Sequence, residues 1–164
     1  MNTNNVKLGP CNVYIDGADI GSTKGGVTVS LEYEMEQSKL LGASPNYDME
    51  LIATRATVSI PFAESTLENL SIITPWNTLK INNAKRLVTI KNERQYIRDY
   101  AAEIKLIPIN SSSDNEVVTI HKAIPTTAPS LIFNLQQRIY EVVFKALEVS
   151  ATDKTLISFG DITA

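Results

Sequence analysis

The chain has 164 residues, 43% of them hydrophobic and 20% charged, which is enough for one domain with a core of its own. Its formal net charge of -3 at pH 7 argues against a nucleic-acid-binding surface, because such surfaces normally carry a basic excess. A single cysteine, Cys11, excludes an intrachain disulfide, and no run of about 18 apolar residues predicts a membrane span.

The first predicted strand covers residues 12–16 and ends in Asp16-Gly17, a dipeptide typical of a tight hairpin turn. A second turn-rich stretch, GSTKGG at 21–26, has lysine next to glycine but lacks the Gly-x4-Gly-Lys-Ser/Thr order of a phosphate loop. We therefore expect turns in this region and no nucleotide site.

Residues 27–36 alternate without exception between apolar and polar side chains, which is the period of a half-buried strand. The apolar positions, which we predict to face the core, are Val27, Val29, Leu31, Tyr33 and Met35. The opposite face carries three glutamates: Glu32, Glu34 and Glu36. A solvent-exposed face needs polar residues but not charges of one sign, so this acidic stripe requires an explanation.

A second predicted strand covers residues 49–62, with Val58 and Ile60 on its core face and Arg55 on the face of the glutamates. The loop between the two strands, 37–48, is far longer than the roughly 2–5 residues that usually close a hairpin. Its partly apolar sequence favours a segment that docks on another protein surface over a mobile loop tip. The docking residues would be Leu40, Leu41, Pro45 and Tyr47.

One short amphipathic helix is predicted over about residues 63–74, where Pro75 ends the pattern. Further strand patterns cover 85–91, 97–109, 116–124 and 138–150. A C-terminal tail, 151–164, is partly apolar and has no partner in the pattern. We therefore predict a single mainly β domain over 1–164, an antiparallel β-sandwich or partly closed barrel flanked by the one helix.

Residues suited to catalysis are sparse. His121 is the only histidine and lies within a predicted strand, so a Ser-His-Asp arrangement would depend on it alone. Carboxylates are plentiful but no pair is singled out, which leaves a glycosidase as the best enzymatic alternative. Trp76, directly after the helix, is expected to pack on the core rather than to stack on a sugar. We predict no enzyme, no metal site and no cofactor.

The chain combines a turn-and-strand element, GPCNVYIDGADIGSTKGGVTVSLEYE at 9–34, with a strand and helix, RATVSIPFAESTLENL at 55–70. Both stretches resemble the major tail tube proteins of tailed bacteriophages, in which a V-Y-V-D-G turn and an A-E-x-T-L-x-x-L helix recur. The resemblance covers the first part of the chain only. It implies a sandwich domain that forms hexameric rings, stacked into a hollow tube that conducts the genome to the host.

The resemblance also implies a role for the acidic stripe. Glu32, Glu34 and Glu36 would face the lumen with Arg55 beside them, because acidic walls repel a polyanion that lysine and arginine would hold. The alternative is an outward-facing solvated strip. We expect the loop 37–48 to become ordered when rings stack.

Partners under this resemblance would be further copies of the chain, with tape-measure, tail terminator and baseplate proteins. DNA would pass through without specific binding. The expected location is the virion tail, assembled in the host cytoplasm, since the first residues, MNTNNVKLG, lack the pattern of a secretory signal. Contractile tails, non-contractile tails and phage-derived particles all fit the pattern.

A stand-alone carbohydrate-binding β-sandwich is the alternative from another class of protein. Such a module would present aromatic side chains on one flat sheet face, whereas the 6 Tyr, 4 Phe and 1 Trp of this chain are spread along its sequence. This spread favours the tube subunit.

Overall fold

The mainly β prediction is confirmed by a computed structural model of the chain, which describes residues 11–21, 23, 25–37, 49–63, 66–109, 114–128 and 140–161. The predicted docking residues Leu40, Leu41, Pro45 and Tyr47 lie outside these described residues. The strands are β1 (Cys11–Ile15), β2 (Ala18–Asp19), β3 (Thr28–Gln37), β4 (Met49–Phe62), β5 (Thr78–Asn82), β6 (Lys85–Thr89), β7 (Ala102–Pro108), β8 (Val118–Pro125), β9 (Tyr140–Ala146) and β10 (Ile157–Phe159). The helices are α1 (Leu67–Ile73) and the 3-10 helices η1 (Ile97–Tyr100) and η2 (Asp114–Glu116).

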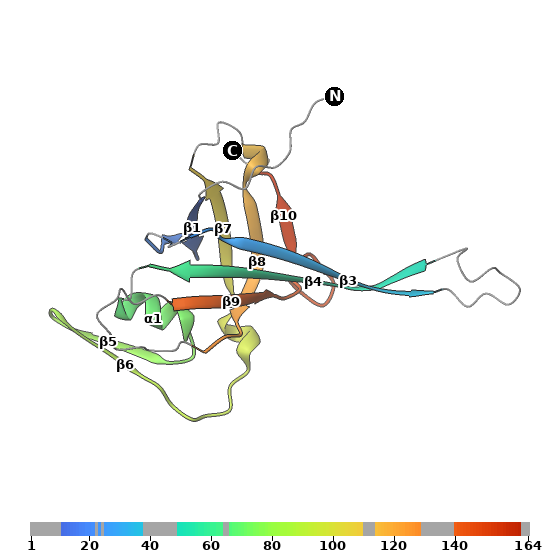
Figure 1. Ribbon diagram of the computed structural model, residues 1–164. Helices are drawn as coiled ribbons and strands as arrows, with labels where there is room; N and C mark the ends of the chain where they lie inside the picture. The colour runs from blue at the N-terminus through green and yellow to red at the C-terminus, as the bar shows by residue number, and fades with distance from the viewer. Residues whose placement is uncertain are drawn as a thin grey trace, which may run out of the picture.

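Eight strands form one antiparallel sheet in the order β2-β1-β7-β8-β9-β4-β3, with β10 added on β8, and the sheet does not close into a barrel. Strand β8 is the corner of this sheet. It pairs with β7 between Val118 and Ala123, and it also pairs with β10 at residues 118–120 and with β9 at residues 123–125. Figure 1 shows that β4 and β9 consequently cross β7 and β8 at a steep angle, so the sheet folds over into two layers.

The hydrophobic core lies between these two layers. Strands β4 and β9 contribute Val58, Ile60 and Phe144, each no more than 1% exposed. Strands β1 and β7 contribute Val13 and Ile104, both at 0%. Burial of side chains of this kind stabilises the fold by about 1.5–3 kcal/mol each. The prediction that Val58 and Ile60 face the core is therefore confirmed.

The turn predicted at Asp16-Gly17 is confirmed and joins β1 to β2. Asp16 has φ 49 and Gly17 has φ 77, so both turn residues adopt the left-handed conformation that a tight two-residue hairpin requires. Asn83, with φ 53, begins the two-residue turn between β5 and β6, in which only this first residue has a positive φ. The β5–β6 hairpin forms a separate two-stranded sheet, and its first strand was not predicted from the sequence.

The helix begins later than its pattern predicted, at Leu67 rather than near residue 63. Thr66 is the N-cap, and its hydroxyl accepts a hydrogen bond from the Asn69 backbone N–H at 3.1 Å. The Asn69 side chain donates to the Ile20 carbonyl at 3.3 Å, which ties the helix to the segment after β2. Helix α1 therefore packs between the main sheet and the β5–β6 hairpin (Figure 1).

The C-terminal tail was predicted to have no partner, and this prediction is wrong for β10. Residues 157–159 pair with β8, opposite residues 118–120. Two side-chain contacts hold the strand in place: Lys105 forms an ion pair with Asp161 at 2.7 Å, and the His121 ring bonds Ser158 at 2.6 Å. The sequence pattern missed this pairing because a three-residue strand is too short to show a period.

Candidate assembly surface

Strands β3 and β4 form a hairpin that is much longer than the core beneath it. The pairing continues from Thr28 opposite Ser59 to Gln37 opposite Met49. Figure 1 shows that the hairpin runs past the layer formed by β1, β7 and β8, which we call the second layer, and projects from the body. We call residues 31–37 and 49–55 the arm, and residues 27–30 and 56–62 the base.

One face of the arm is apolar and exposed. Tyr33 and Met35 are 57% and 53% exposed, and Leu51, opposite Met35, is 57% exposed. The prediction that Leu31, Tyr33 and Met35 are core residues is therefore wrong for the single chain, although the alternation itself is present. The reason is that the second layer covers only the base of the hairpin.

The base follows the prediction. Val27 and Val29 are partly buried and pack against the core, and Val29 lies opposite the buried Val58. The same apolar alternation is thus covered at one end of the hairpin and uncovered at the other.

The opposite face of the arm is acidic. Glu32, Glu34 and Glu36 are all exposed, and Arg55 lies on their face, directly opposite Glu32. The Arg55 guanidinium bonds diagonally to the Glu34 carboxylate at 2.6 Å. Both side chains are about half exposed, so the pair contributes only about 0.2–1 kcal/mol.

A fourth carboxylate, Glu50, lies directly opposite Glu36, where two like charges repel. The described part of this face therefore holds four carboxylates and one guanidinium. The face continues onto the body as the polar outer side of β4 and β9, where Thr57 is opposite Lys145. The acidic stripe is thus the projecting end of a larger polar surface.

A β-bulge in β4 explains why Leu51 and Met49 lie on the apolar face of the arm, which alternation did not predict. The register shifts because Glu34 is opposite Ala53 while Met35 is opposite Leu51, which leaves Ile52 without a cross-strand partner. The shift places Leu51 and Met49 on the apolar face, where simple alternation from Val58 would put them among the glutamates. The adjacent apolar pair Leu51-Ile52 was the signal in the sequence.

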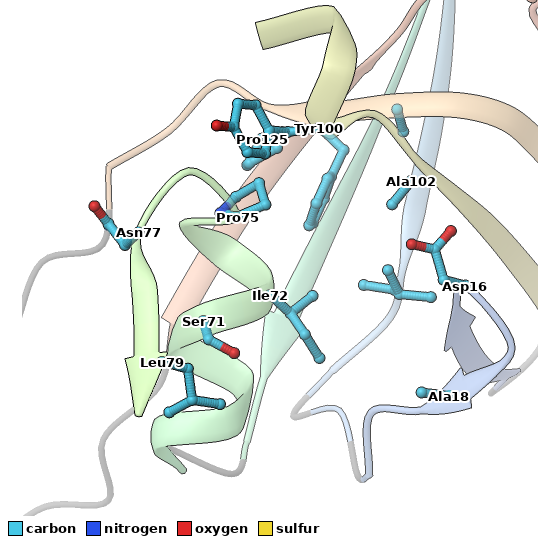
Figure 2. A pocket seen from close by; sticks show the side chains of 13 residues that line it. Asp16, Ala18, Ser71, Ile72, Pro75, Asn77, Leu79, Tyr100, Ala102 and Pro125 are labelled. Atoms are coloured by element: carbon cyan, nitrogen blue, oxygen red, sulfur yellow. The ribbon is translucent and has the colours of Figure 1, made fainter. Parts of the chain in front are cut away.

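A cavity of about 410 Å³ lies between α1, β5 and the main sheet (Figure 2). Ile72 and Tyr100 point into it, and its polar groups are mostly engaged. The Tyr100 hydroxyl donates to Gln95, and Asp16 accepts the Glu103 backbone N–H at 2.8 Å. Asn77 differs, because its side-chain N and O are buried without a hydrogen-bond partner. This lining supplies packing and offers no nucleophile with a neighbouring base.

The described residues contain no group of three or more His, Cys, Asp or Glu side chains placed to hold a metal ion. None of the described helices is long and apolar enough to cross a membrane. Comparison with protein-family models gives no match for the chain, and comparison with curated proteins gives none either.

Proposed function

We propose that the chain is a structural subunit of a phage-type tail tube, which assembles into stacked hexameric rings whose acidic lumen conducts genomic DNA. The arm is the observation that carries this proposal. A folded chain that exposes Tyr33, Met35 and Leu51 on one projecting face needs another surface to cover them. The resemblance of residues 9–34 and 55–70 to tail tube proteins supports another copy of the chain as that surface.

The charge of the other face supports its position in the bore. DNA is held by lysine and arginine contacts to its phosphates, so a wall of carboxylates lets it pass without sticking. In this proposal Glu32, Glu34 and Glu36 line the lumen, and Arg55 fixes the strand register beside them. The predicted loop 37–48 would contact the adjacent ring.

The remaining partners follow from the same proposal. Tape-measure protein would occupy the lumen during assembly, and terminator and baseplate proteins would bind the two ends of the tube. The subunit is a component of the virion tail, is assembled in the host cytoplasm and performs no enzymatic reaction.

The distribution of exposed aromatic residues favours this function over a carbohydrate-binding module. Among the described residues, Tyr33 is on β3, Tyr96 precedes η1 and Phe159 is on β10. These positions belong to three separate elements and form no common platform for a sugar ring.

Electron microscopy of the purified protein in negative stain, over a range of concentrations, tests the assembly. Rings or tubes are expected, and a monodisperse monomer at every concentration would contradict the proposal.

The position of the acidic face is tested by labelling. A Cys11→Ser background removes the native thiol, and Glu34→Cys then places one thiol on the acidic face. A small maleimide should label it in monomers and tubes, while a maleimide on a bulky polymer should label monomers only. Glu103→Cys is the matched control, because Glu103 is exposed on β7, in the other layer, and should react with both reagents in both states. Equal labelling of both positions in tubes by the bulky reagent would place the stripe outside.

A further inference from the structure

A second surface of the molecule has the opposite charge to the arm. The β5–β6 hairpin and the extended segment after it, residues 78–96, contain a single carboxylate, Glu93. Their cationic residues are Lys80, Lys85, Arg86, Lys91 and Arg94. We call this segment the basic hairpin. It is positive although the whole chain has a net charge of -3, so charge is segregated within the molecule.

Some of these charges already have partners. Arg86 pairs with Glu68 of α1, and Lys91 approaches Glu93 at 3.8 Å. Lys80 and Lys85 lie on the other face of the hairpin from Arg86, because Lys80 is opposite Leu87 and Lys85 is opposite Asn82. Both lysines are exposed, and neither forms an ion pair with the described residues.

The basic hairpin also exposes apolar side chains. Leu87, between the two lysines on this outer face, is 58% exposed. Ile90 and Tyr96, in the segment that follows, are 68% and 80% exposed. The surface therefore combines uncovered apolar area with positive charge, as the arm combines uncovered apolar area with negative charge.

The two surfaces lie at opposite ends of the molecule. Figure 1 shows the arm projecting from one side of the body, with β5 and β6 at the other. One copy therefore cannot bring its own arm onto its own basic hairpin, whereas two copies placed head to tail can. A contact between two different surfaces of identical chains repeats around a ring or along a tube.

We propose that the arm of one copy packs its apolar face on the outer face of the basic hairpin of the next copy. Tyr33, Met35 and Leu51 cover Leu87, and the long side chains of Lys80 and Lys85 lie along the apolar contact with their ammonium groups at its margin. This inference rests on the proposed function and names the surface that receives the arm.

The contact leaves the acidic face free for the lumen. The arm is a ribbon two strands wide, so the carboxylates on its far face remain close to the margin of the contact. The Debye length is about 8 Å at physiological ionic strength, so carboxylates at the margin of the contact still attract a basic neighbour. Opposite charge therefore selects the partner while apolar contact provides the area.

Crosslinking of mixed single-cysteine variants tests this contact. Met35→Cys and Leu87→Cys are made separately in the Cys11→Ser background, with different mass tags, and are mixed before assembly and treated with a short bis-maleimide. The expected product is a dimer of the two different variants, at least about tenfold above that from Met35→Cys mixed with Glu103→Cys. Equal yields from the two mixtures in assembled tubes would overturn the inference and leave the tube function intact.

Charge reversal gives an independent measurement. Lys80→Glu should raise the concentration needed for assembly by about tenfold, because it replaces attraction to the arm by repulsion. Lys154→Glu makes the same charge change at an exposed position outside the basic hairpin and should leave assembly within about twofold. Equal effects of the two reversals would contradict the contact, whereas a wild-type chain that never assembles would contradict the proposed function itself.

Discussion

The base and the arm of the β3–β4 hairpin have the same alternating sequence and opposite surroundings. In the base, Val58 is 1% exposed beneath the second layer, whereas in the arm Tyr33 is 57% exposed. Period-two alternation defines two faces of a strand, but a face becomes a core only where another layer covers it. A regular amphipathic strand can therefore begin in the core of a molecule and end on a surface that the same molecule leaves uncovered.

The largest effect is expected from a charge placed in the base. Val58→Asp would bury an unpaired carboxylate and should lower the free energy of unfolding by about 3–5 kcal/mol. Urea denaturation, or insolubility of the expressed chain, measures this. Thr57→Asp is the control, since Thr57 faces the polar side opposite Lys145 and should change stability by less than about 1 kcal/mol. Similar losses from both substitutions would contradict the assignment of the two faces.

An aspartate placed on the apolar face of the arm should have a different outcome from one placed in the base. Tyr33→Asp leaves a solvated charge on an exposed strand, so the folded monomer should keep its stability within about 0.5–1 kcal/mol. Assembly should nevertheless fail, because the charge lies within the proposed apolar contact. Thermal unfolding and sedimentation velocity measure the two properties, with Lys154→Gln as a control of equal charge change. An unfolded Tyr33→Asp chain would mean that the arm belongs to the core of the single molecule.

The smallest effect concerns the ion pair on the arm. Arg55→Gln should cost about 0.2–1 kcal/mol of unfolding free energy, because both partners of the Arg55–Glu34 pair are half solvated. A double-mutant cycle with Glu34→Gln isolates the pairwise energy, which 1 M salt should largely remove. A coupling energy above about 2 kcal/mol would indicate that Arg55 and Glu34 are far less solvated than their exposure in the single chain implies.

Sequence patterns predicted the parts of the fold that depend on local order. The Asp16-Gly17 turn, the two long strands and the side of Arg55 follow from turn chemistry and alternation, which involve neighbouring residues only. Elements that depend on distant partners were not predicted. Strand β10 exists because β8 offers it an edge, and the exposure of Tyr33 depends on where the second layer ends.

The arm likewise combines a feature that local sequence order predicts with one that it does not. Its acidic face could be read from the sequence, because Glu32, Glu34 and Glu36 recur every second residue. The contribution of Leu51 does not follow from alternation alone, because a bulge at Ile52 reverses the alternation of β4 and only the apolar pair Leu51-Ile52 marks it in the sequence. The second strand of the basic hairpin was predicted within 85–91, but its first strand and its role as a surface were not, since its charges can be paired with the arm only when the opposite end of the molecule is known.

Strand β3 is the outer strand of the main sheet and has an edge free of described strands. Such an edge can recruit an identical strand from a second molecule. If two β3 strands paired about a two-fold axis perpendicular to the sheet, the same face of both copies would coincide and glutamate would lie opposite glutamate. Six carboxylates would then crowd one short ribbon, a cost that a pairing between unlike surfaces avoids. The acidic stripe thus disfavours such a closed dimer, which is consistent with the proposed assembly of the chain into a tube.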